Sequence, residues 1–334
     1  MPSYVAVVPK QEGEAARTRL KQAGVLRRDR KIAERDGELL IPVTRGEPLG
    51  YPVESVNLEV RASRPHSYRD LVHVPEEVRP LLPRAFDVVG HVVIVRLPQE
   101  LRPHETAIGD AFLQMDRGAK TVAVDEGVRG SFRERALRVI GGREETRTLH
   151  HEFGLSLALD PAEVHFSPRM ATERRRVAGL IRGAEVVVDA FSGVGPFALH
   201  AARAGARRVY AVDANPQAVA FLRENIRRNR ADAVVPSEGS MEDVVSQFEP
   251  ADRFILDYPW DPLPYLPLSL GTLKDGGVLH YYEILERTAR DHRIATLQAS
   301  AAPSRSLEVE GIREVRGYSP TQAHFAFDLR IGRA

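Results

Sequence analysis

A short apolar run that ends in an acid and a glycine-rich turn limits the fold of this chain more than any other feature. The run reads Val186-Val-Val-Asp189-Ala-Phe-Ser-Gly193-Val-Gly195-Pro196-Phe197. The valines predict a buried strand, and Pro196 suits the first turn of a helix. Gly193 and Gly195 allow a tight turn whose backbone can approach a ligand closely. Strand, glycine-rich turn and helix in this order are typical of α/β domains that bind a nucleoside-containing cofactor.

Strand and helix patterns alternate through residues 161–334. We predict strands at Val186–Asp189, Arg208–Asp213, Val234–Pro236, Phe254–Tyr258, Val278–Tyr282, Ser306–Val309 and His324–Arg330. We predict helices at Pro196–Ala204, Pro216–Asn229, Leu266–Leu273 and Glu286–Ser300. This alternation predicts an α/β fold with a doubly wound, mostly parallel sheet, which is a Rossmann-like domain.

The chain before residue 161 is predicted to form two small α+β domains, at 1–62 and 63–160. In the first we predict a strand at Tyr4–Val8, a helix at Glu12–Ala23, and a hairpin of Lys31–Ala33 and Glu38–Val43. In the second we predict a broken helix at Leu71–Leu82, one buried strand at Val88–Leu97, a helix at Glu105–Met115, and short strands at Thr121–Asp125 and Leu137–Ile140. The Rossmann-like domain at 161–334 follows them.

The composition excludes several classes of protein. The chain has no cysteine, so it has no disulfides, no cysteine-bound zinc and no cysteine nucleophile. No apolar run approaches the ~20 residues that span a membrane. The N-terminus lacks the basic segment and apolar core of a secretory signal. We therefore expect a cytoplasmic protein that does not enter a membrane.

Basic side chains are clustered although the net charge is only +1. One cluster comprises Arg17, Arg19, Lys21, Arg27, Arg28, Arg30 and Lys31, and a second comprises Arg174, Arg175 and Arg176. Such clusters contact nucleic-acid phosphates, or they form solvated helix faces. Charge alone leaves both interpretations open.

The glycine-rich turn fits two cofactors. A dinucleotide requires G-x-G-x-x-G, but Ala198 stands at the third glycine position. S-adenosylmethionine has no phosphate, and its sulfonium and amino groups favour a nearby carboxylate such as Asp189. A second acid, Asp213, ends the next predicted strand, where it could accept hydrogen bonds from the ribose hydroxyls of either cofactor.

A motif at the end of the fourth predicted strand favours S-adenosylmethionine. Asp257-Tyr-Pro259-Trp260 fits the Asp/Asn-x-Pro-aromatic pattern of methyltransferases that act on amines and nucleobases. The side-chain oxygen accepts a proton from the target nitrogen, and the aromatic ring can stack on a base. We therefore predict a methyltransferase, with no metal required.

Several motifs together resemble the archaeal and eukaryotic tRNA (guanine-N1)-methyltransferases, which modify position 37. They are Gly130-Ser-Phe-Arg133, His151-Glu-Phe-Gly154, Val164-His-Phe-Ser-Pro-Arg169, Glu173-Arg174 and Asp189–Phe197. The resemblance covers almost the whole chain. It implies a monomeric enzyme that binds the anticodon loop and outer corner of tRNA, and a first domain that recognises tRNA.

The resemblance also implies roles for individual residues. Arg133 matches an arginine of the family that stabilises charge near guanine O6. Glu173 matches the glutamate that serves as general base for N1–H, and Arg169 matches an arginine that lines the substrate side of the pocket. Asp257 and Pro259 fall on the family's Asn-Leu-Pro, which holds the guanine edge. The implied cofactor residues are Asp189, Phe191, Gly193, Gly195, Phe197, Asp213, Ala214, Ser240, Met241 and Asp257.

Some positions depart from the family pattern. Asp257 replaces an asparagine, so it could accept from guanine N1–H and share or take over the base role. His165 stands where tyrosine is common, and Ser240 where an acid near adenine is common. Three alternatives therefore stay open: the related wybutosine-pathway aminocarboxypropyltransferases, guanine-N2 methylation, and a tRNA-binding protein whose methyltransferase domain is inactive.

Overall fold

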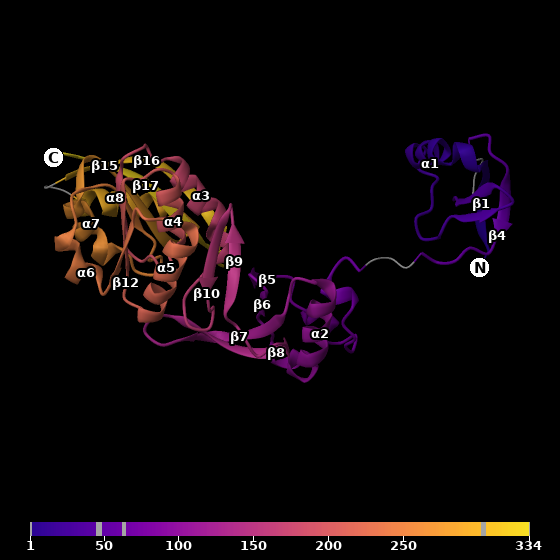
Figure 1. The fold of residues 1–334 in the computed structure, drawn as a ribbon, viewed down its shortest axis with the longest axis horizontal. Helices are drawn as coiled ribbons and strands as arrows, with labels where there is room; N and C mark the ends of the chain where they lie inside the picture. Colours follow the sequence, from indigo (N-terminus) through magenta and orange to yellow (C-terminus); the bar gives the residue numbers. More distant parts are fainter. Residues whose placement is uncertain (1, 45–48, 62–64, 302–304, 334) are drawn as a thin grey trace. The chain divides into compact units, whose positions relative to one another are not determined.

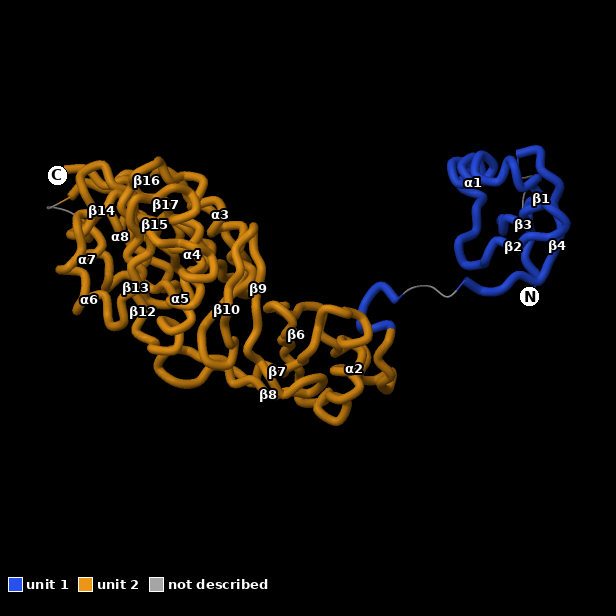
Figure 2. Tube along the Cα trace, viewed as in Figure 1, with its two compact units in different colours: residues 1–70 blue, residues 71–334 orange. Residues whose placement is uncertain are grey.

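The computed structural model describes residues 2–44, 49–61, 65–301 and 305–333. The chain divides into two compact units, residues 1–70 and residues 71–334 (Figure 2). The domain boundary predicted between residues 62 and 63 lies outside the described residues. The described helices include none that is long and apolar enough to cross a membrane.

The first unit is a four-stranded antiparallel sheet covered by one helix. The strand order is β2 (Ala33–Arg35), β3 (Glu38–Pro42), β1 (Ser3–Pro9), β4 (Val53–Val56). Helix α1 (Gly13–Gln22) packs Ala16 and Leu20 into the core of this unit. The predicted hairpin is confirmed, although its first strand begins at Ala33 rather than Lys31. Strand β4 was not predicted.

The second unit begins with a four-stranded sheet ordered β5 (Phe86–Val89), β6 (Val92–Val95), β7 (Thr121–Arg129), β8 (Glu134–Gly142). Strands β6 and β7 are parallel, the other pairs are antiparallel, and α2 (Glu105–Met115) contacts β7 and β8. Figure 1 shows the β7–β8 hairpin running from beside α2 toward α5 (Pro216–Asn229).

Two predictions in this region are wrong. The single strand predicted at Val88–Leu97 is the hairpin of β5 and β6, which turns at Gly90 with φ +57°. The broken helix predicted at Leu71–Leu82 is reduced to a 3-10 turn at Arg79–Leu81. Prolines in that segment lack the backbone N–H that a longer helix needs.

A two-stranded hairpin follows the β5–β8 sheet in the chain and precedes the large seven-stranded sheet. Strands β9 (Thr148–Glu152) and β10 (Leu155–Leu159) were not predicted, and they meet at a Phe153-Gly154 turn with positive φ at both residues. The Asn225 side chain of α5 hydrogen-bonds both the N–H and the C=O of Ala158, at 2.7 and 3.0 Å. This pair of bonds fixes β10 against α5.

A seven-stranded sheet forms the largest part of the unit and confirms the predicted Rossmann-like fold class. Its order is β13 (Val234–Glu238), β12 (Arg208–Asp213), β11 (Val186–Asp189), β14 (Ala251–Leu256), β15 (Leu273–Glu286), β17 (Gln322–Arg333), β16 (Arg305–Gly317). The first five strands are parallel. Strand β17 runs antiparallel to both of its neighbours, β15 and β16.

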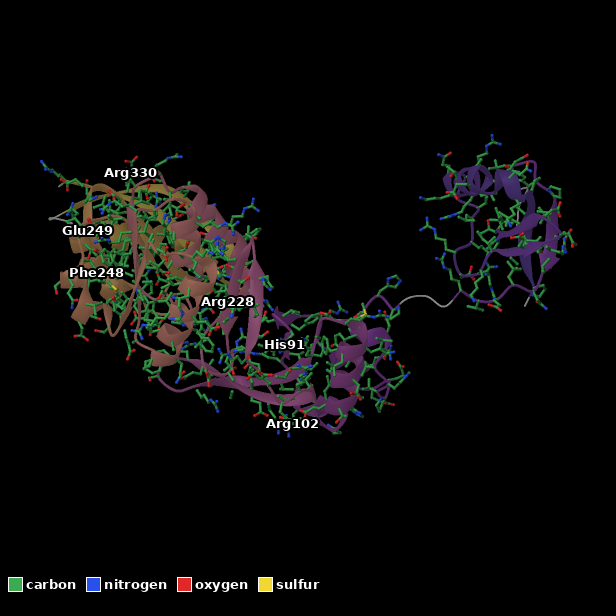
Figure 3. All side chains as sticks on the ribbon, in the orientation of Figure 1. His91, Arg102, Arg228, Phe248, Glu249 and Arg330 are labelled. Carbon is green, nitrogen blue, oxygen red and sulfur yellow. The ribbon has the colours of Figure 1, made fainter. Side chains whose placement is uncertain are left out.

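Helices cover both faces of this sheet. Helices α3 (Ala171–Gly179), α4 (Pro196–Arg203) and α5 contribute side chains to one apolar core. Helices α6 (Met241–Val244), α7 (Leu266–Thr272) and α8 (Arg290–Ala301) contribute to the other. Side chains fill the space between the layers, and Phe248, labelled in Figure 3, stacks on Tyr210 with ring centroids 4.2 Å apart.

Candidate active site

Three acids gather at one edge of the seven-stranded sheet because the strands that carry them are parallel neighbours. Asp189 ends β11, Asp213 ends β12, and Asp257 directly follows β14. Beside them lies a cleft of about 600 Å³, open to solvent. Five of the predicted residues line it: Phe191, Gly193, Phe197, Asp257 and Pro259.

The glycine-rich turn has the backbone that the sequence predicted. Gly193 and Gly195 have φ of +53° and +89°, a region that favours glycine. A Cβ on Gly195 would lie 2.3 Å from the Leu222 side chain. Asp213 accepts hydrogen bonds from the backbone N–H groups of Gly193 at 2.7 Å and Asn215 at 2.9 Å. The acid that ends β12 therefore also holds the turn in shape.

Asp189 is buried with one oxygen unused. Its Oδ2 accepts a hydrogen bond from the Ala198 N–H at 3.0 Å, whereas Oδ1 has no partner among the described residues. Burial, together with the nearby Asp257 carboxylate, raises the pKa of Asp189 to about 8. Burial also raises the pKa of Asp213. Asp189 lies behind the cleft wall rather than in its lining, and a cationic ligand group near its free Oδ1 would satisfy it, so the acid fits the amino and sulfonium groups of S-adenosylmethionine.

The remaining predicted cofactor residues lie at the same edge of the sheet. Phe191 stacks on Tyr258 with ring centroids 4.8 Å apart. Ala214 follows Asp213, and buried Met241 begins α6. Ser240 caps α6, since its Oγ accepts from the Asp243 N–H at 3.3 Å and donates to Oδ2 of Asp243 at 2.7 Å. None of these last three residues lines the cleft.

Asp257 faces the cleft without a hydrogen-bond partner among the described residues. Its Oδ1 is shielded from solvent, and the nearest imidazole nitrogen, Nε2 of His324, lies 3.8 Å away. Burial raises the pKa of Asp257 to about 6, although the Arg174 and Arg316 cations act in the opposite direction. Burial lowers the pKa of His324 to about 3, so that ring is neutral and forms no ion pair with Asp257.

The middle sheet reaches the candidate active site through Arg133. This residue lies in the turn between β7 and β8, with φ +59°, and its guanidinium carbon is 3.8 Å from the centre of the Trp260 ring. Arg133 and Arg169 line a second, larger cleft, which shares His165, Trp260 and Arg316 with the first. Arg169 is anchored there because its Nε donates to Asp87 at 2.7 Å.

Glu173 lines neither cleft. It is buried, and it accepts hydrogen bonds from Nε and Nη2 of Arg176 at 2.9 and 2.7 Å and from the Tyr282 hydroxyl at 2.9 Å. Arg176 in turn binds Asp328. The charge of Glu173 is felt by Asp257, whose pKa it raises. The structure therefore brings Asp257, Pro259 and Arg133 together at the clefts but leaves Glu173 outside them.

Three site residues were not predicted from the sequence. Arg174 is buried in the cleft wall and forms a bidentate ion pair with Glu152. The motifs His151-Glu-Phe-Gly154 and Glu173-Arg174 contain both partners, so their charges could have been paired from the sequence. Arg316 and His324 lie on β16 and β17, far from any motif in the sequence. The described residues contain no cluster of three or more metal-ligating side chains.

The sheet order and the three convergent acids define a class, the S-adenosylmethionine-dependent methyltransferase fold. Comparison with known families narrows this class. The TRM5/TYW2 methyltransferase domain matches residues 148–310, the TYW2 N-terminal domain residues 69–146, and the tRNA methyltransferase 5 N-terminal domain residues 7–48.

Individual relatives agree with the family matches. The tRNA (guanine(37)-N(1))-methyltransferase Trm5b of Pyrococcus abyssi is 38% identical over 97% of this chain and 98% of its own. Its crystal structure matches with a TM-score of 0.89, covering 99% of both chains. The solved complex of aTrm5 and tRNALeu has 28% identity and a TM-score of 0.82 over 98% of this chain and 99% of its own. TYW2 of Methanocaldococcus jannaschii in complex with AdoMet has 27% identity and a TM-score of 0.59, over 75% of this chain and 100% of its own.

The chain belongs to the TRM5/TYW2 methyltransferase family. The family resemblance read from the sequence motifs is confirmed, and so is the S-adenosylmethionine-dependent class.

Proposed function

We propose that this protein transfers a methyl group from S-adenosylmethionine to N1 of guanosine 37 in tRNA. The observation that carries the proposal is the meeting of Arg133 and the Asp257–Trp260 motif beside the cofactor acids. The full-length similarity to the Pyrococcus abyssi guanine-37 enzyme supports the same reaction.

The cofactor residues are proposed to act as follows. Asp189 would bind the amino group of S-adenosylmethionine, and Asp213 would bind its ribose hydroxyls. The turn at Gly193–Gly195 would contact the cofactor through its backbone. S-adenosylmethionine, when bound, supplies a methyl carbon that accepts an electron pair as its bond to the sulfonium sulfur breaks. The apolar rings of Phe191 and Phe197 would exclude water from this end of the cleft.

The target guanine is proposed to leave the anticodon loop and enter the cleft. Unstacking a base costs a few kcal/mol and is cheaper in a loop than in a duplex. Arg133 would stabilise negative charge on O6, and Asp257 would hold the N1–H and 2-amino edge. Arg169 would line the substrate side. For Glu173 to act as general base directly, its bonds to Arg176 would have to open.

The tRNA body is proposed to be bound by a basic groove in the first unit. The groove is lined by Arg17, Lys21, Leu26, Arg27, Arg28, Arg30, Lys31, Ile32 and Arg61. Three of these cations, Lys21, Arg28 and Arg61, have no ion-pair partner within the described ranges, so they are free for phosphates. This groove would take the outer corner of tRNA while the second cleft takes the anticodon loop.

The predicted division into 1–62, 63–160 and 161–334 remains our proposal for how these tasks are shared. The family matches at 7–48, 69–146 and 148–310 support a threefold division. The monomeric state and the cytoplasmic location remain predictions.

Methyl transfer to defined transcripts tests the proposal. Two transcripts that differ only at position 37, one with guanosine and one with adenosine, are incubated with the protein and methyl-labelled S-adenosylmethionine. The proposed function requires label in the guanosine transcript alone. Equal labelling of both transcripts, or no labelling of either, would contradict it.

A second function is favoured by a specific observation. The match to the TYW2 N-terminal domain at 69–146 and the similarity to archaeal tRNA(Phe) aminocarboxypropyltransferases make transfer of an aminocarboxypropyl group the main alternative. The TYW2 structure covers 75% of this chain, against 99% for Pyrococcus abyssi Trm5b, so methylation is the better supported reaction.

A further inference from the structure

Asp257 and Glu173 are two acids near the cleft that differ in their hydrogen-bond donors: Glu173 is surrounded by donors, and Asp257 has none among the described residues. Every strong contact of Glu173 is a donor: two guanidinium nitrogens of Arg176 and the hydroxyl of Tyr282. Asp257 lines the cleft with 21% of its side chain exposed, and it has no hydrogen-bond donor among the described residues; its Oδ1 is shielded from solvent. A half-buried carboxylate with one shielded oxygen and no donor is best satisfied by a ligand that brings N–H groups into the cleft.

The Watson–Crick edge of guanine brings two such groups side by side. Its N1–H and 2-amino N–H are adjacent donors, and an ionised carboxylate offers two acceptor oxygens. An asparagine at this position would offer only one acceptor. Because Asp257 replaces the family's asparagine, the side chain directly after β14 is a carboxylate that can accept the N1 proton, which an amide cannot.

We propose that Asp257 is the group that accepts the N1 proton of the target guanine, and this inference rests on the proposed function above. In this step the N1–H bond breaks and an O–H bond forms on the Asp257 carboxylate. The electron pair of the broken bond stays on N1, where it forms the new bond to carbon. The proton then leaves Asp257 for solvent. Glu173 acts as a positioning residue that holds Arg176 and Tyr282 behind the cleft.

The charged and titratable groups around Asp257 come from every neighbouring element. They are Arg316 on β16, His324 on β17, Tyr282 on β15, Glu173 and Arg174 on α3, Asp189 on β11, and His165 in the loop before α3. Neither arginine donates a hydrogen bond to Asp257 within the described residues, so their attraction does not lock the carboxylate. With burial opposing them, the pKa of Asp257 is about 6, which suits a base working near pH 7.

The first experiment is the pH dependence of single-turnover methyl transfer at saturating S-adenosylmethionine. We expect the wild-type rate to rise with pH through a limb with a midpoint near 6, as Asp257 ionises. In Asp257→Asn the limb disappears and the rate at pH 7 falls about 100-fold or more, as expected for loss of a general base. Asp261→Asn is the matched control, because Asp261 is exposed on the same loop and lines neither cleft, and it should keep the wild-type profile.

Glu173→Gln separates the two acids. We expect it to lower the rate by about 10-fold at most and to keep the limb, because Gln retains the hydrogen bond from Tyr282. A limb that survives Asp257→Asn but is lost in Glu173→Gln would overturn the inference. Absence of any methyl transfer by the wild type would instead overturn the proposed function and, with it, the inference.

A binding measurement tests the contact between Asp257 and the target guanine in the absence of catalysis. The affinity of the guanosine-37 transcript is measured without cofactor between pH 5 and pH 8. We expect the wild-type affinity to weaken as the pH falls below about 6, because a protonated Asp257 loses an acceptor. The Asp257→Asn affinity should be flat over that window. Parallel pH profiles for the two proteins would contradict the contact.

Discussion

The guanidinium of Arg133 lies over the ring of Trp260, 3.8 Å from its centre. This contact joins the β7–β8 turn of the middle sheet to the loop after β14, so a residue outside the Rossmann-like domain reaches the candidate active site. Arg133 reaches this position through a left-handed backbone conformation, with φ +59°.

Arg133→Ala is expected to slow the chemical step without affecting cofactor binding. Loss of one group that stabilises a developing oxyanion typically costs 10²–10³-fold, so we expect a fall in the single-turnover rate of roughly 100-fold. Arg133→Lys should recover part of the loss, since it keeps the charge but not the planar fork. Rapid-quench kinetics and calorimetric titration with S-adenosylmethionine measure the two effects. Arg117→Ala, on an exposed loop that lines no described cleft, is the control.

Gly195→Ala is expected to weaken cofactor binding and lower the melting temperature. A Cβ would lie 2.3 Å from the buried Leu222 side chain, and alanine is strained at φ +89°. We expect at least a 10-fold loss of S-adenosylmethionine affinity by calorimetry. Gly271→Ala is a matched control, because no atom lies within 4 Å of its added Cβ and its helix gains propensity. Equal behaviour of the two variants would contradict our account of the turn.

The Glu152–Arg174 ion pair is expected to make the free energy of unfolding fall as the pH becomes acidic. Burial alone would raise the pKa of Glu152, but hydrogen bonds from His200 and Arg174 outweigh it and lower the pKa from 4.5 to about 2. The folded-state pKa is depressed, so the stabilisation is present above pH 4.5 and is lost as the pH falls toward 2. Its size is about 3 kcal/mol.

Urea unfolding of the wild type and Glu152→Gln at several pH values measures the contribution of the Glu152–Arg174 pair to the free energy of unfolding. Trp260 is the only tryptophan of the chain, so its fluorescence reports the unit at 71–334. Glu152→Gln should be less stable at pH 7 by roughly 3 kcal/mol, because Arg174 is left buried and unpaired. The difference should shrink on acidification. The exposed pair of Glu249 and Arg207 provides the control, and Glu249→Gln should change little.

Removal of Lys21, Arg28 and Arg61 together should weaken tRNA binding more than chemistry. We expect KM for tRNA to rise about 10-fold or more while kcat is nearly unchanged. The slope of log affinity against log salt should fall by about 2 to 3, because three phosphate contacts are lost. Arg19→Ala, on helix α1 with Lys21 but outside the groove, should behave as wild type. A salt slope that does not change would show that the groove does not contact phosphates.

The sequence predicts well where apolar runs are bounded by clear end signals. The bounds of β11, β12 and α5 match the predicted ones. Asn215 explains the last of these, since its side chain accepts from the Gln217 N–H at 2.9 Å and caps the helix before Pro216. The acids and glycines of the cofactor cleft follow these elements, so their gathering was also predictable.

The sequence fails where tertiary contacts decide the structure. The turn at Gly90 and His91 lies inside a continuous apolar run, and its N–H groups are bound by His150 and Thr148 from a distant hairpin. Arg316 lies after an irregularity in the pairing of β16 with β17, which no local pattern indicates. The pairing of Glu173 with Arg176 is local, yet only the structure reveals that both are turned away from the clefts.

Nucleoside mass spectrometry of tRNA treated with the protein and S-adenosylmethionine tests the central claim most directly. It separates 1-methylguanosine from 2-methylguanosine and from aminocarboxypropyl products, and fragment mapping locates the modified nucleotide. Our account requires 1-methylguanosine at position 37. Formation of 2-methylguanosine, of an aminocarboxypropyl nucleoside, or of no modified nucleoside at that position would contradict it.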